Sequence, residues 1–81
     1  MIRILYFAKL VDLLGCSSED VDPPPAVADV AGLLAWLRER GPRWARILQS
    51  DAVKVTVNKS FADPGTQVRD GDEVAIVSVG I

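Results

Sequence analysis

The sequence predicts one small α+β domain in which a long helix crosses one face of a mixed β-sheet. Apolar segments with the alternation of strands open and close the chain, over residues 1–8 and 73–79. Between them, residues 30–40 carry apolar side chains at the spacing of a helix. The chain has 81 residues, of which 49% are apolar, and this length and composition suit a single compact core.

The first strand is predicted to be apolar on both sides. Its alternation places Ile2, Ile4 and Tyr6 on one side and Leu5 and Phe7 on the other. Such a strand is expected near the centre of a sheet, where side chains on both of its faces can be buried.

Two short elements follow the first strand. Residues 9–14 predict a short helix that Gly15 ends in a left-handed conformation. Residues 17–22 predict a short polar strand with Val21 as its apolar member, and the proline triplet at 23–25 then stops regular pairing.

The long helix is predicted over residues 30–40. Asp29 is placed to cap this helix by accepting a hydrogen bond from a free backbone N–H. Its apolar stripe, with positions i, i+3, i+4 and i+7, consists of Val30, Leu33, Leu34 and Leu37. Gly41 and Pro42 end the helix, and residues 43–49 predict a second short one.

The last part of the chain predicts a strand, turns and a final strand. Val53, Val55 and Val57 alternate with polar residues, which is typical of a strand with one buried face. Turn signals rich in Asp and Gly follow at 63–65 and 70–72.

The final strand, over residues 73–79, alternates Val74 and Ile76 with Ala75 and Val77. Because the first and last strands are both strongly apolar, we expect both at the centre of the sheet. One long helix across such a mixed sheet is the β-grasp (ubiquitin-like) arrangement. Residues 1–81 are expected to form this single domain, with short extra helices and a flexible carboxyl-terminal tail from about residue 78.

Composition excludes several classes of function. The net charge of −2 argues against a nucleic-acid-binding protein, which needs clustered positive charge. Four arginines do fall within nine residues, namely Arg38, Arg40, Arg43 and Arg46. We favour a solvated helix end for them, where cations suit the helix dipole, over a docking patch for an acidic partner.

The sequence offers no catalytic residues and no metal ligands in a recognisable pattern. A single cysteine and no histidine exclude an internal disulfide, four-cysteine clusters and histidine-based catalysis. Cys16 lies in a predicted loop without a nearby cation, so a reactive thiol is not favoured. Asp70, Asp72 and Glu73 are interpreted as turn formers rather than a metal site. No apolar run approaches the about 18 residues of a membrane span, and a cytoplasmic location is expected.

One face of the predicted sheet stays uncovered by the long helix. Its apolar residues, together with the start of the tail, are the predicted partner interface: Leu5, Phe7, Phe61, Ala75, Val77, Ser78 and Val79. An exposed apolar patch with aromatic residues usually marks an interaction site, and we favour this over cover by side layers or by self-association.

Several segments together resemble one known family. They are the strand at 2–8 with Leu13-Leu14-Gly15, the helix at 30–40, Arg43-Trp44-Ala45, Val57-Asn58, and the run from Asp70 to Ala75. Their order and spacing over nearly the whole chain resemble the MoaD/ThiS sulfur-carrier family, and most closely its MoaD-like branch, the small subunits of molybdopterin synthase.

The resemblance implies a carrier that does not catalyse by itself and binds no cofactor. In this family an E1-like adenylyltransferase (MoeB-like) uses ATP to adenylate the carboxylate of a terminal Gly-Gly. Sulfur then displaces AMP and leaves a thiocarboxylate. The tail enters the large catalytic subunit (MoaE-like), where its sulfur helps to build the molybdopterin dithiolene, and the open sheet face packs against both partners.

This sequence departs from the family at its carboxyl end. It ends in Gly80 and Ile81 instead of Gly-Gly, and Ser78 and Val79 stand where a Pro-Pro is usual. Three explanations stay open: the sequence stops short of its glycines, Ile81 is removed to expose Gly80, or the chain is a paralogue without carrier chemistry. In the last case it is an interaction module, or a ThiS-like relative, without a competent tail. Val11-Asp12 also replaces an Arg-Glu pair of many relatives.

Overall fold

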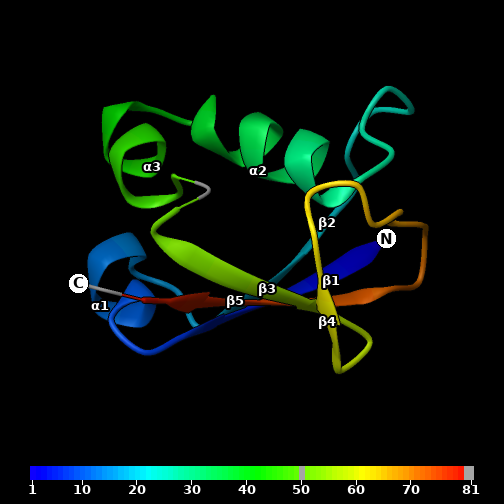
Figure 1. Ribbon diagram of the computed structural model, residues 1–81. Helices are drawn as coiled ribbons and strands as arrows, with labels where there is room; N and C mark the ends of the chain where they lie inside the picture. Colours follow the sequence, from blue (N-terminus) through cyan, green and yellow to red (C-terminus); the bar gives the residue numbers. More distant parts are fainter. Residues whose placement is uncertain (50, 80–81) are drawn as a thin grey trace.

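The computed structural model describes residues 1–49 and 51–79 of the chain (Figure 1). It contains eight helices and strands in these residues, in the order β1 (Ile2–Phe7), α1 (Leu10–Leu14), β2 (Ser18–Val21), α2 (Val30–Arg38), α3 (Pro42–Ile47), β3 (Val53–Val57), β4 (Ser60–Ala62) and β5 (Glu73–Ser78). All helices and strands predicted from the sequence are present, within two residues of the predicted bounds.

The five strands form one mixed sheet in the order β2-β1-β5-β3-β4. β1 and β5 run parallel, while the other neighbouring pairs are antiparallel. The apolar last strand is therefore central, and the apolar first strand lies beside it, as the sequence predicts. This topology, with a helix crossing one face, confirms the β-grasp fold.

The core lies between the sheet and helices α2 and α3, which cover the same side of it (Figure 1). The strand residues predicted to lie beneath the long helix are all at most 3% exposed: Ile2, Ile4, Tyr6, Val74 and Ile76. The whole predicted stripe of α2 is also buried, at 5% exposure or less. Burying one such side chain contributes roughly 1.5–3 kcal/mol, so these contacts are the main support of the fold.

Helix α2 begins where the sequence predicts and ends slightly earlier. The Asp29 carboxylate accepts a hydrogen bond of 2.7 Å from the Gly32 N–H, which confirms the predicted cap. The helix ends at Arg38, and Glu39 and Arg40 form a turn instead of a last helical turn. Pro42 does not only end this helix but begins α3, because a proline at the first helical position loses no hydrogen bond.

The strand β4 was not predicted. It pairs antiparallel with β3 across a two-residue turn of Asn58 and Lys59, whose φ angles are +50° and +71°. Two positive φ angles are what a tight hairpin turn of the primed type requires. The usual sequence signal is Asn-Gly, and a lysine in the second position hid this hairpin from the sequence analysis.

Two glycines adopt the left-handed conformations that their positions need. Gly15 ends α1 with φ +81°, as predicted, and its N–H bonds to the Val11 carbonyl. Gly71 has φ +89° in the predicted turn before β5. In the part of the chain that the structure describes, no helix has the length and apolar character needed to cross a membrane.

Candidate partner-docking face

The side of the sheet opposite to α2 and α3 carries a first row of apolar residues. Leu5 of β1 pairs with Ala75 of β5, and Ala75 pairs with Thr56 of β3. Phe61 of β4 pairs with Thr56 and so continues the row to the edge of the sheet. Because directly paired residues point to the same face, these side chains lie side by side.

A second row lies nearer the carboxyl end of β5. Phe7 of β1 pairs with Val77, and Val77 pairs with Lys54 of β3. The apolar part of the face thus reaches to within two residues of the last described residue, Val79.

Together the two rows form a patch that we call the outer face, consisting of Leu5, Phe7, Phe61, Ala75 and Val77. Phe61 is 87% exposed and Phe7 46%, whereas the other three side chains are half-buried among their neighbours. No other phenylalanine is present in the chain, so both lie on this face. Exposed aromatic residues on a sheet can bind in pockets of a partner protein, so this face is a candidate interface.

The structure does not place Ser78 on the outer face. Ser78 pairs with the buried Val53, which puts it on the helical side of the sheet, and its Oγ accepts a hydrogen bond from the Lys9 N–H. Val79 donates its N–H to the Ala52 carbonyl. The predicted tail residues Gly80 and Ile81 lie outside the described residues.

Charged residues flank the outer face at both of its ends. At the far end Arg3 donates from Nε to Asp20 at 3.1 Å, and this hydrogen bond with the nearby carboxylate raises the pKa of Arg3. Arg3 also lies directly opposite Glu73 in the register of β1 and β5. At the end where β5 stops, Lys54 is exposed and lies beside Val77. An apolar centre with a charged rim is the usual composition of an interface between two proteins.

A polar network that the sequence analysis missed joins the sheet to the end of α2. Arg40 forms two hydrogen bonds of 2.8 Å with the Glu19 carboxylate of β2. The Tyr6 hydroxyl donates to the same carboxylate at 2.7 Å. The hydrogen bond from Arg40 lowers the pKa of Glu19, while burial and the Glu19 contact raise the pKa of Tyr6.

The rings of two tryptophans lie close to the Arg40 guanidinium. Its central carbon lies 4.6 Å from the ring centroid of Trp44 and 5.9 Å from that of Trp36. Trp44 also meets Tyr6 edge to face, with 5.9 Å between ring centroids. Cys16 is half-buried near this network, and burial raises the pKa of its thiol, which opposes a reactive thiolate.

The four clustered arginines divide into two groups. Arg38 donates to the Leu48 carbonyl at 2.8 Å, and Arg40 binds Glu19, so both have partners within the chain. Arg43 and Arg46 are exposed on α3. The prediction of a solvated helix end therefore holds for this second group, whereas Arg38 and the exposed Arg40 in addition have acceptors within the chain that the sequence did not predict.

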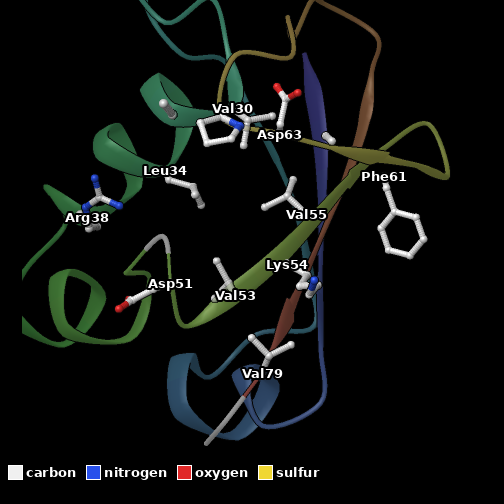
Figure 2. A pocket seen from close by; sticks show the side chains of 13 residues that line it. Val30, Leu34, Arg38, Asp51, Val53, Lys54, Val55, Phe61, Asp63 and Val79 are labelled. Carbon is white, nitrogen blue, oxygen red and sulfur yellow. The ribbon is translucent and has the colours of Figure 1, made fainter.

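A groove of about 590 Å³ lies on the helical side, between α2 and the start of β3 (Figure 2). Figure 2 shows Leu34, Val53 and Val55 pointing into it, and Phe61 of β4 also belongs to its lining. The groove stays open because the short β4 pairs with β3 only from Val55 onwards. Its lining combines apolar residues with four charged ones, Arg38, Asp51, Lys54 and Asp63.

The acidic turn before β5 is a structural feature. Asp72 accepts hydrogen bonds from the Arg69 N–H at 2.8 Å and from the Asn58 side chain at 3.0 Å. Asp70 pairs with the amino group of Met1. Across residues 1–49 and 51–79 there is no group of three or more His, Cys, Asp or Glu residues that could hold a metal ion.

Comparisons with known proteins point in one direction. The family model described as the ThiS family matches residues 4–80. The chain is 27% identical to the molybdopterin synthase sulfur carrier subunit of Haemophilus influenzae and 31% identical to that of Escherichia coli, each time over 93% of this chain and 90% of the relative. It also resembles the structure of a putative molybdopterin converting factor, subunit 1, from Pyrococcus furiosus, with a TM-score of 0.76, 22% identity and coverage of 95% and 94% of the two chains.

Proposed function

The chain belongs to the ThiS family, and on this premise we propose that it is a sulfur carrier that serves as the small subunit of a molybdopterin synthase. In this role it donates sulfur from a carboxyl-terminal thiocarboxylate during molybdenum cofactor biosynthesis. The carrier is not a catalyst by itself; it presents its tail to enzymes that are.

The observation that carries this proposal is the position of the outer face relative to the end of β5. Phe7 and Val77 lie one row before the strand ends, and Val79 still bonds to Ala52. A partner that covers this face therefore has Val79, the last described residue, close to its own surface. Holding a reacting group next to a binding surface makes its delivery effectively intramolecular.

Two partners follow from the carrier role. An E1-like, MoeB-like adenylyltransferase uses ATP to activate the terminal carboxylate, and a MoaE-like large subunit accepts the sulfur. The apolar outer face and its charged rim supply one surface that suits each of them in turn.

The experiment that tests the proposal measures the mass of the product of the intact gene. The purified protein is incubated with an E1-like activating enzyme, ATP and a sulfur donor. We expect a mass increase equal to the replacement of one oxygen by one sulfur. An unchanged mass, with partner binding intact, contradicts the carrier role and supports a β-grasp interaction module instead.

A matched pair of variants connects this reaction to the outer face. Phe7→Asp places a charge in the exposed apolar patch and should prevent both partner binding and the gain in mass. Ala35→Asp places the same charge at an exposed position of α2 and should leave both unchanged. Equal effects of the two variants would contradict docking through the outer face.

A further inference from the structure

The corner between β1 and α1 lies against the end of β5. Strand β1 ends at Phe7, which pairs with Val77. Ala8 then turns the chain away with a φ of +58°, a left-handed conformation that a residue with a Cβ rarely adopts. The next residue, Lys9, donates its N–H at 3.1 Å to the Oγ of Ser78.

This hydrogen bond stabilises two features that are unfavourable by themselves, the left-handed backbone of Ala8 and the uncapped start of α1. A left-handed residue other than glycine persists only where its surroundings hold it, and here the contact with Ser78 fixes the peptide that follows Ala8. Helix α1 also has no capping side chain of its own. The Ser78 hydroxyl, from a strand at the other end of the sequence, supplies an acceptor at this helix start.

The opposite edge of β5 is held as well. Ser78 is in register with Val53, and the Val79 N–H donates to the Ala52 carbonyl at 2.9 Å. The end of β5 is thus fixed on one side by the β1–α1 corner and on the other side by the start of β3. These two contacts hold Ser78 and Val79, the last residues that the structure describes.

We propose that Ser78 is a positioning residue for the carboxyl-terminal segment, which it orients through its hydrogen bond with the Lys9 N–H. This inference rests on the proposed carrier function. If Ser78 and Val79 are held in place, the segment that follows them samples fewer orientations. It is then directed toward the partner's active site more often than a segment whose first residues are free to move. Restricting a tethered group in this way raises its effective concentration at the reacting centre.

The test compares Ser78→Ala, which removes the acceptor, with Ser78→Thr, which keeps a hydroxyl. The reaction measured is activation of the chain by the E1-like enzyme, with the carrier as the varied substrate. We expect Ser78→Ala to lower kcat by about 5- to 10-fold, as for the loss of one hydrogen bond of ordinary strength, while KM stays nearly constant. Ser78→Thr should restore kcat, and Ser60→Ala, at an exposed position of β4, should have no effect.

A second measurement reports the contact itself without any partner. In solution NMR, the Lys9 amide hydrogen should exchange slowly in the wild type and in Ser78→Thr, and faster in Ser78→Ala. The Ser60→Ala control should resemble the wild type. Equal exchange of the Lys9 amide in all variants would overturn the inference.

The outcomes separate the two proposals. A wild-type protein that no activating enzyme modifies contradicts the carrier function and, with it, the positioning role. An active wild type with an equally active Ser78→Ala variant contradicts the positioning role alone. A rise in KM at unchanged kcat also overturns it, because such a change indicates weaker docking rather than a misdirected tail.

Discussion

The guanidinium of Arg40 lies over the indole ring of Trp44, 4.6 Å from the ring centroid, while it binds the Glu19 carboxylate with two hydrogen bonds. One side chain therefore joins the turn after α2 to α3 and to the edge strand β2. Bidentate pairs of this kind hold geometry better than single exposed ion pairs do.

Removing this side chain should destabilise the fold. We expect Arg40→Ala to lower the free energy of unfolding by about 1–2 kcal/mol, because it breaks charge-assisted hydrogen bonds and a cation–π contact that are only partly exposed. Urea denaturation measures the change. Arg43→Ala, at an exposed position of α3, is the matched control and should change stability by less than about 0.5 kcal/mol. Equal losses in both variants would show that the network contributes nothing specific.

The same network should make stability depend on pH. The pKa of Glu19 is lowered in the folded protein, chiefly by the hydrogen bond from Arg40, relative to its ordinary value of 4.5. A carboxyl group with a lowered folded pKa adds stability above its unfolded pKa, and this stability is lost as the pH falls through the folded pKa. The wild type should therefore lose more stability than Glu19→Gln on acidification below about pH 4.5. Parallel curves of unfolding free energy against pH for the two proteins would refute this prediction.

Phe61 should matter for binding and not for stability. Because its side chain is 87% exposed, Phe61→Ala should change the free energy of unfolding by less than about 0.5 kcal/mol. Binding to the large subunit should weaken about tenfold, as for the loss of an aromatic anchor at an interface. Calorimetric titration measures the affinity, with Asp12→Ala on α1 as a control of unchanged affinity. An unaltered Kd for Phe61→Ala would remove β4 from the docking surface.

The hairpin between β3 and β4 should gain stability from a single glycine. Lys59 has a φ of +71°, where a side chain is disfavoured, so Lys59→Gly should raise the free energy of unfolding by up to about 1 kcal/mol. Thermal unfolding measures the gain. At the next residue, inside β4, Ser60→Gly should have the opposite sign, because glycine weakens a strand. A loss of stability in Lys59→Gly would mean that the left-handed turn is not strained.

The sequence predicted those features that depend on local periodicity. The alternation of Ile2, Ile4 and Tyr6 with Leu5 and Phe7 was sufficient to assign the buried and outer sides of β1, and the register confirms that assignment. The same alternation predicted the buried side of β5. Such patterns hold because each side of a strand meets only one environment.

Features that depend on contacts between distant segments could not be predicted in this way. Glu19 and Arg40 become partners only because β2 lies at the sheet edge beside the end of α2, and neither residue has a local signal for this pairing. The contact of Ser78 with Lys9 likewise requires the first and last strands to be neighbours. The outer face was predictable, but the role of its residues in partner binding stays a prediction.

The place of β5 between β1 and β3 has a consequence for folding during synthesis of the protein. On the ribosome, the other four strands emerge before the one that separates and joins their two pairs, β2-β1 and β3-β4. Each pair therefore lacks its central neighbour until β5 has emerged, so the five-stranded sheet forms only at that stage and depends on the long-range pairing of β1 with β5.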